Sequence, residues 1–180
     1  ICASQIKDFG LLGPYFQTGK EKKFEIYPDP ISVNNIRGFA MFLNLKKFNN
    51  IGFFDENFFL YFEEIDLCKR VILSGNKIYL LPNVIINHEG AKSVNFKNDE
   101  ELEVNRNWHW MWSSFYYSKK YKGFLRSLIY FSPKLFLSLL KFLILKILKK
   151  NYQSKIYQHR FLGLLNSIKG NKSFYRPKIN

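Results

Sequence analysis

The sequence predicts an α/β domain followed by basic amphipathic helices, and three observations support this prediction. Short apolar runs surround one well-marked helix in the first half of the chain, an order typical of α/β proteins. From about Asn98 onward the composition becomes helical, aromatic and basic. The chain has 180 residues, 47% of them hydrophobic, which suffices for one main core but not for two large domains.

The predicted elements before the acidic region are short. Alternating apolar residues predict strands, a Gly-Pro-rich stretch predicts a loop, and a glycine ends a helical turn. On these grounds we expect strands at 1–6 and 23–27, a loop at 10–19, a mostly buried strand at 35–45 and a helical turn at 46–51.

Residues 63–74 form the clearest predicted helix. Its first turn is acidic, which complements the positive end of the helix dipole, and Gly75 ends it. Asp66 and Arg70 lie four residues apart, so they can pair on one face of the helix. The elements expected after it are strands at 77–81 and 83–87 divided by Pro82, helices at 100–117 and 152–168, and an apolar stretch at 121–150 that Pro133 divides into two helices.

The charge balance favours an anionic partner. The formal net charge is +14, from 28 Lys and Arg against 14 Asp and Glu, which suits nucleic acid, anionic lipid or a phosphorylated substrate. The basic residues of the C-terminal part alternate with long aliphatic side chains instead of forming a polar stripe, so we expect no nucleic acid. Cys2 and Cys68 form no metal or disulfide pattern, which indicates a reducing compartment.

The stretch 124–148 is long enough to span a membrane, but Arg126, Lys134, Lys141 and Lys146 interrupt it. A charge at the bilayer centre costs about 2.5–3.5 kcal/mol. The pattern therefore favours helices that lie in the membrane interface, with lysines reaching the lipid phosphates. Packing on the protein's own core or on a partner, and a true span, remain the alternatives.

The acidic residues form a recognisable pattern with the aromatic residues around them. Residues 52–70 read GFFDENFFLYFEEIDLCKR. This stretch resembles the acceptor-side motif of glycosyltransferase family 2, which typically reads Gly-Gly-Phe-Asp-Glu, then Phe-x-Tyr-x-Glu-Asp-x-Asp-Leu-x-x-Arg. The likeness continues through Gly75 and Pro82 to the sequence HEGAKS at 88–93. Glu64 stands where the family usually has Asp.

The resemblance implies a fold, an activity and a location. Residues 1–118 would form the acceptor-side half of a GT-A-type, Rossmann-like glycosyltransferase domain, and 119–180 a basic amphipathic tail that associates with membranes. The family transfers a sugar from a nucleotide-sugar donor to a cell-surface glycan or lipid-linked acceptor by inverting single displacement. The tail suggests a peripheral position on the cytoplasmic face of an anionic membrane. Because Ile1 already lies in a strand-like run, we expect the donor-binding half to precede it.

The resemblance also implies a site. Glu64 takes the position of the catalytic base and Glu63 a supporting one, and His88 completes a site for a divalent metal, Mn²⁺ or Mg²⁺. The other metal ligands would come from an Asp-x-Asp motif, which this sequence lacks. The residues expected to bind the acceptor are Arg37, Gly38, Phe39, Asp55 and Glu56.

The residues alone leave structural alternatives open. Acids at a helix start are commonly caps, the stretch 37–40 can be an ordinary buried strand, and His88 can be a structural histidine. The alternative function is that of a non-catalytic membrane-surface interaction protein that keeps a degenerate transferase core.

Overall fold

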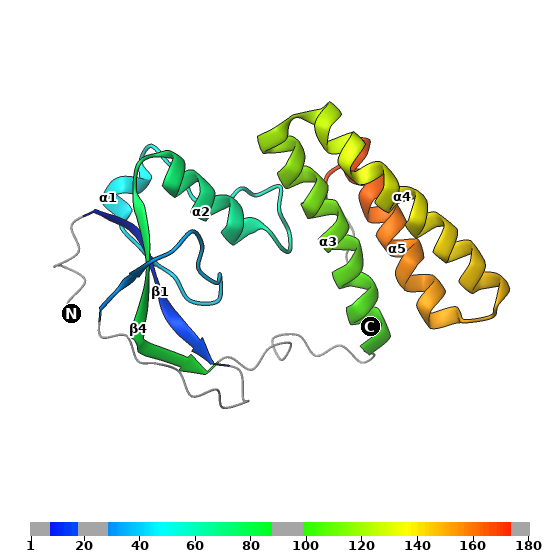
Figure 1. The fold of residues 1–180 in the computed structure, drawn as a ribbon, viewed down its shortest axis with the longest axis horizontal. Coiled ribbons are helices and arrows are strands. Elements are labelled where there is room, and N and C mark those ends of the chain that lie inside the picture. Colours follow the sequence, from blue (N-terminus) through cyan, green and yellow to red (C-terminus); the bar gives the residue numbers. More distant parts are fainter. Residues whose placement is uncertain (1–7, 18–28, 88–98, 174–180) are drawn as a thin grey trace. The chain divides into compact units, whose positions relative to one another are not determined.

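The computed structural model describes residues 8–17, 29–87 and 99–173 and has a mixed α/β fold (Figure 1). The chain divides into two compact units. One contains Ile1–Asp55 and Glu63–Val94, and the other contains Glu56–Phe62 and Asn95–Asn180. We call them the sheet unit and the helical unit. The strands expected at 1–6 and 23–27 lie outside the described residues.

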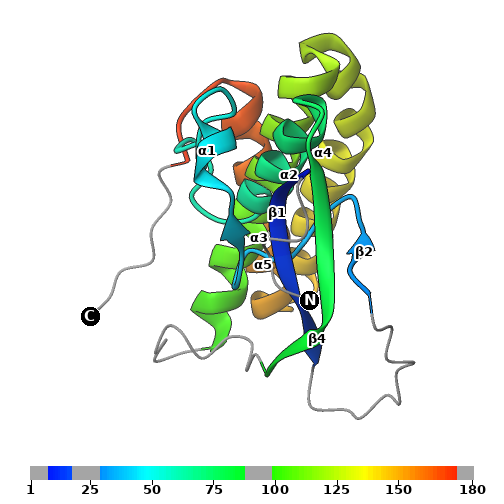
Figure 2. The ribbon, with the colours of Figure 1, turned by 90° about the vertical axis from the view of Figure 1, so that its left-hand side faces the viewer.

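Among the described residues, the sheet unit contains four strands in the order β2-β4-β1-β3. The long strands β1 and β4 run parallel and side by side (Figure 2), and the two short strands pair antiparallel to them. The strands are β1 (Phe9–Gln17), β2 (Ile31–Ser32), β3 (Phe42–Leu43) and β4 (Lys77–Asn87). The α/β class expected from the sequence is therefore confirmed at the level of a mixed sheet with helices.

The prediction of a loop at 10–19 is wrong, since β1 contains most of these residues. Two of its glycines serve close packing instead of a turn. A Cβ on Gly10 would lie 2.6 Å from Val71 Cγ1, and a Cβ on Gly13 would lie 2.8 Å from Ile36 Cβ. Glycine in a strand often marks such close approach, and local sequence cannot distinguish this from a turn.

The two strands expected on either side of Pro82 form one strand, β4. The proline still has a local effect. Pro14 of β1 pairs with Leu81, and the next β1 residue, Tyr15, pairs with Ile85. The register of β4 against β1 therefore shifts in the segment that contains Pro82. Because proline has no N–H to donate, it is tolerated at such an irregularity without ending the strand.

The mostly buried strand expected at 35–45 is also wrong, since only Phe42–Leu43 are in a strand. Ile36 is buried, whereas Phe42 and Leu45 are 59% and 64% exposed. The apolar run therefore does not lie in the interior of the sheet. Ile36 anchors an irregular loop to the core, and β3 is a short edge strand.

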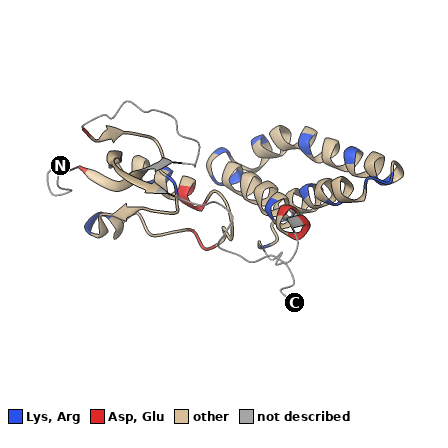
Figure 3. Cartoon of the chain, turned by 90° about the horizontal axis from the view of Figure 1, so that it is seen from below, with Lys and Arg blue, Asp and Glu red and all other residues tan. Residues whose placement is uncertain are grey.

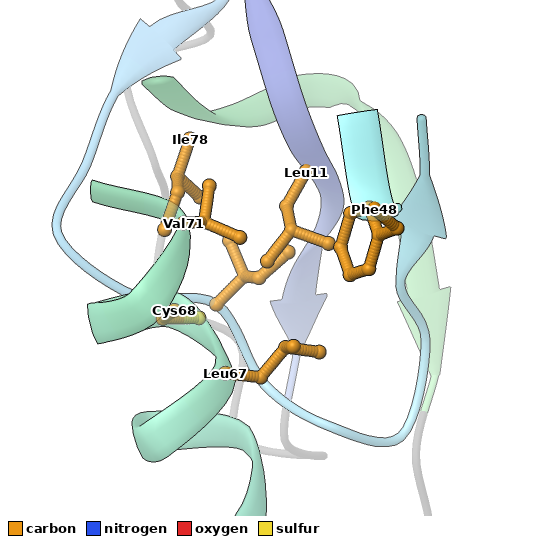
Figure 4. Close-up of a cluster of buried hydrophobic side chains, with 7 residues drawn as sticks. Leu11, Phe48, Leu67, Cys68, Val71 and Ile78 are labelled. Atoms are coloured by element: carbon orange, nitrogen blue, oxygen red, sulfur yellow. The ribbon is translucent and has the colours of Figure 1, made fainter. Parts of the chain in front are cut away.

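Two helices complete the sheet unit, α1 (Leu45–Phe48) and α2 (Glu63–Leu73), close to the expected bounds. The C-terminus of α2 is closed by a Schellman arrangement. The N–H of Gly75 donates to Ile72 O at 2.9 Å and that of Asn76 to Val71 O at 3.2 Å, with Gly75 at φ 78°. One face of α2 packs on the core of the unit (Figure 4), whose buried members are Leu11, Ile36, Phe48, Leu67, Cys68, Val71 and Ile78.

Three long helices make up most of the helical unit: α3 (Asp99–Lys122), α4 (Phe124–Ile147) and α5 (Asn151–Ile168). The helices expected at 100–117 and 152–168 are confirmed. The division at residue 118 falls within α3, and as a boundary of function it stays a prediction.

The break expected at Pro133 is wrong, because α4 continues through it. Proline removes the N–H that would bond to the carbonyl four residues earlier, that of Ile129. The Ser132 hydroxyl donates to Ile129 O at 3.0 Å and satisfies this carbonyl. The helix therefore continues through Pro133 without leaving that acceptor unpaired.

Small residues lie where α3 and α5 meet. The Ser167 hydroxyl donates to Trp112 O at 2.9 Å, and a Cβ on Gly163 would lie 2.2 Å from Trp108 O. Gly163 and Ser167 are four residues apart on one face of α5. Such small-xxx-small spacing lets two helix backbones approach closely.

We predict that Gly163→Ala lowers the melting temperature of the chain. The new methyl group would meet backbone, so the helices must separate, at a cost typical of overpacking, about 1–3 kcal/mol. This should exceed the gain of about 1 kcal/mol in helix propensity. Thermal circular dichroism measures the change, with Gln158→Ala on the same helix as control. An unchanged or raised melting temperature for Gly163→Ala would contradict the close contact.

Helix α4 exposes many of its apolar side chains. Ile129 and Ile147 are 73% and 79% exposed, whereas Ser127 and Ser138 are buried. Within the described residues, α4 is the one helix that is long and apolar enough to cross a membrane, and only 11% of its most apolar window is buried. By itself this suggests membrane association only weakly.

Candidate active site

The backbone directly before helix α2 is strained. Tyr61 and Phe62 have φ values of 67° and 71°, in the left-handed region. This conformation costs about 1–2 kcal/mol for each residue that has a Cβ. Within the helical unit the Tyr61 and Phe62 rings each lie 5.3 Å from the Trp110 ring, which holds them in place. Strain of this kind is often kept where a site needs a fixed geometry.

Helix α2 begins at Glu63 and Glu64, as expected, and each of these residues has one buried carboxylate oxygen. Oε2 of each residue is buried and has no hydrogen-bond partner among the described residues. A buried acceptor without a partner costs free energy, which an ordinary helix cap avoids by bonding to backbone N–H groups. The arrangement therefore suits carboxylates that receive a proton or hydrogen bond from a ligand.

The environment of Glu63 favours its protonated form. Burial raises the pKa of the Glu63 carboxyl above its ordinary value of 4.5, and the adjacent Glu64 charge acts in the same direction. Its own backbone N–H opposes this, with a smaller effect than burial. A raised pKa is the property expected of a carboxylate that exchanges protons near neutral pH.

The loop around Gly38 lies against Glu64. A Cβ on Gly38 would be 3.2 Å from Glu64 Cβ and 3.9 Å from its Cδ, so a larger side chain would press on the carboxylate stem. Ile36 and Cys68 lie together in the same core cluster, which fixes the loop to α2. Gly38 and Glu64, predicted for one site, are therefore neighbours.

Asp66 and Arg70 form the predicted pair. Arg70 Nε lies 2.8 Å from Asp66 Oδ2, and the Asp66 side chain is fully buried. The other guanidinium nitrogens donate to the carbonyls of Ile51, Gly52 and Phe53. The pair therefore fixes the turn at Gly52 to α2, which is a structural role.

The other predicted acceptor residues are less clearly placed. Arg37 and Glu56 are exposed, and Phe39 and Asp55 are half-buried. Asp55 belongs to the sheet unit and Glu56 to the helical unit. Their roles stay predictions.

The metal prediction falls outside the described residues, because His88 is not among them. The described ranges contain no group of three His, Cys, Asp or Glu that could hold a metal ion. The residues described therefore do not by themselves provide the expected metal site.

We predict that Glu63→Gln stabilises the sheet unit at neutral pH. Because the folded pKa of Glu63 is raised, the folded state binds more protons than the unfolded chain, and stability falls as pH rises from the ordinary value of 4.5 through the folded pKa. Glutamine carries no such charge, so the Glu63→Gln variant should be more stable than the parent at neutral pH. The difference should vanish below the ordinary pKa of glutamate. Urea denaturation at both conditions measures this, with exposed Glu56→Gln as control. Equal stability of Glu63→Gln and the parent at neutral pH would contradict the burial of this charge.

Two features were not anticipated from the sequence. The left-handed backbone at Tyr61 and Phe62 has no glycine to signal it. In the helical unit, Lys141, Tyr157 and Arg160 gather from two helices, which only the pairing of α4 with α5 brings together.

The arrangement at the start of α2 offers two adjacent carboxylates, one of raised pKa, beside a loop in which Gly38 lies close to the Glu64 side chain. Such a set can accept a proton from a hydroxyl group. No protein-family model, no curated protein and no solved structure matches this chain.

Proposed function

We propose that this chain is the acceptor-side part of an inverting glycosyltransferase, with Glu64 as the catalytic base. The observation that best supports the proposal is the pair of buried, unpartnered oxygens of Glu63 and Glu64 at the start of α2. These residues fall where the resemblance to glycosyltransferase family 2 expects the base and its neighbour. Gly38, expected on the acceptor side, packs against Glu64.

The proposed step is a single displacement. The acceptor hydroxyl attacks the anomeric carbon of a nucleotide-sugar, its proton passes to the Glu64 carboxylate, and the nucleoside diphosphate leaves with the bonding electrons. Glu63 has a supporting role beside Glu64. The resemblance places the donor in a part of the domain other than the acceptor side, so no residue of this chain is assigned to it. The resemblance would place a divalent metal at His88 together with an Asp-x-Asp motif, which this sequence lacks.

The proposed location is the cytoplasmic face of a membrane, with peripheral attachment through the helical unit. The exposed apolar residues of α4 and the lysines spaced along it support this (Figure 3). Long lysine side chains can lie along apolar surface and place their charge at lipid phosphates.

The alternative, a non-catalytic membrane-surface protein, has one observation in its favour. Aromatic residues of the family-like motif pack on α3 within the helical unit: Phe58 lies 4.9 Å from Tyr116 and Phe59 lies 4.9 Å from His109, between ring centroids. Their use in packing leaves them fewer faces for a sugar.

The experiment is a transfer assay on the chain expressed with the coding sequence upstream of Ile1. Labelled nucleotide-sugars, a membrane fraction as acceptor source and Mn²⁺ or Mg²⁺ are supplied. Labelled glycan or glycolipid that forms with the protein and not without it supports the proposal. Membrane binding without transfer from any donor would favour the alternative.

A further inference from the structure

A groove of about 500 Å³ lies between α4 and α5. One part of its lining is apolar and comes from Ile144, Leu145 and Ile156. The other part is polar and comes from Lys141, Tyr157 and Arg160. The groove therefore has the two-part chemistry of an amphiphile site.

The polar part concentrates positive charge on one tyrosine. Lys141 Nζ lies 3.4 Å from the Tyr157 hydroxyl and 5.0 Å from the centre of its ring. Arg160 Cζ lies 5.6 Å from the same ring centre. The ring face stabilises each cation modestly, but the two positive charges repel each other.

No carboxylate of α4 or α5 offsets this charge, because the sequence contains no Asp or Glu after Glu103. A neighbouring hollow of about 230 Å³ shares Lys141 and Arg160 and adds Lys134, two helical turns before Lys141 on α4. Three cations thus surround adjoining hollows, and an anion placed there would relieve their repulsion.

The apolar part continues onto the outer surface of the helix. Ile144 lines the groove and is 45% exposed, and its neighbours Leu143 and Ile147 are exposed as well. A free phosphate would contact only the cations. A phosphate that carries hydrocarbon chains would also cover apolar surface, at about 25 cal/mol per Å² removed from water.

We propose that the groove between α4 and α5 binds the phosphate headgroup of an anionic phospholipid, with an acyl chain lying along Ile144 and Ile156. Lys141 and Arg160 hold the phosphate, and Tyr157 orders both cations. This deepens the proposed membrane location and does not depend on the transferase activity. It makes membrane attachment selective for headgroup, whereas the apolar face of α4 alone would bind any bilayer.

The test uses the 180-residue chain and short-chain lipids below their micelle-forming concentration, followed by NMR titration. The probes are dihexanoyl phosphatidylglycerol, dihexanoyl phosphatidylcholine and inorganic phosphate. We expect saturable binding of phosphatidylglycerol at least about tenfold tighter than of either other probe, a difference of about 1.4 kcal/mol. Inorganic phosphate that binds as tightly as the lipid would overturn the lipid assignment and leave a simple phosphate site.

The variants are Lys141→Gln/Arg160→Gln and, as a matched control, Lys149→Gln/Lys150→Gln, which removes the same charge outside the groove. The groove variant should lose at least about tenfold in affinity for phosphatidylglycerol, and the control should stay within about threefold of the parent. If the groove variant and the control lose equal affinity for phosphatidylglycerol, the effect comes from net charge alone and the proposed groove site is wrong. If the double variant does not fold by circular dichroism, Arg160→Gln alone replaces it under the same criterion.

Discussion

Glu64→Gln should lower the rate of sugar transfer by about 10²–10⁴-fold, the usual cost of losing one general base. The change keeps the shape of the side chain and its contact with the Gly38 loop, while it removes the group that accepts the proton. Because the base acts in the transition state, kcat should fall and KM should change little. Steady-state kinetics on the protein expressed with its upstream sequence measure both.

Two companion variants make this result specific. Glu64→Asp keeps a carboxylate that is one methylene shorter, as in the family that this stretch resembles, and should retain most of the rate. Glu63→Gln should lower the rate less than Glu64→Gln, since Glu63 has the supporting role. Activity of Glu64→Gln within a few-fold of the parent would remove Glu64 from the base role. A larger loss for Glu63→Gln would transfer that role to Glu63, whose pKa is raised by burial.

Arg70→Met should destabilise the sheet unit by about 3–5 kcal/mol, because it removes the cation that faces a carboxylate in the interior. The Asp66 side chain is 0% exposed and that of Arg70 is 19% exposed. The variant also removes the hydrogen bonds from Arg70 to the turn at Gly52. Urea denaturation at neutral pH measures the loss.

A second ion pair of the same unit supplies the control. Lys77 and Asp8 lie 2.7 Å apart with side chains 58% and 50% exposed. Water screens the charges of an exposed pair, so Lys77→Met should change stability far less than Arg70→Met. If the two variants cost the same, the Asp66–Arg70 pair does not act as a buried pair.

The parts of the fold set by local interactions were predictable. The acidic first turn of α2, the Asp66–Arg70 spacing and the terminal Gly75 act within a few residues of one another, and each was anticipated. Tertiary contacts decided the elements that were missed. Position 10 of β1 is a glycine because Val71 leaves no room there for a side chain, a contact that local sequence does not reveal. The long helix passes through Pro133 because Ser132 satisfies the freed carbonyl.

The candidate site divides in the same way. The residue types at the start of α2 point to a carboxylate pair, and the resemblance points to its role. The contact of Gly38 with Glu64 depends on how the loop at 35–45 packs. The apolar pattern of these residues wrongly predicted a strand there. The groove contains Lys141 of α4 and Tyr157 of α5, which lie sixteen residues apart in the sequence. They meet only because the two helices pair, and hydrophobic periodicity alone does not reveal that pairing.

The most direct test of the proposed transferase is proton NMR of the transfer reaction, read for the configuration of the anomeric carbon. The protein expressed with its upstream sequence is incubated with a nucleotide-sugar donor and an acceptor. Single displacement with Glu64 as base predicts a glycoside of inverted configuration, formed about 10²–10⁴-fold more slowly with Glu64→Gln. A product of retained configuration would contradict the single displacement. Failure to form any glycoside, from a protein that is folded and still binds membranes, would contradict the proposed transferase itself.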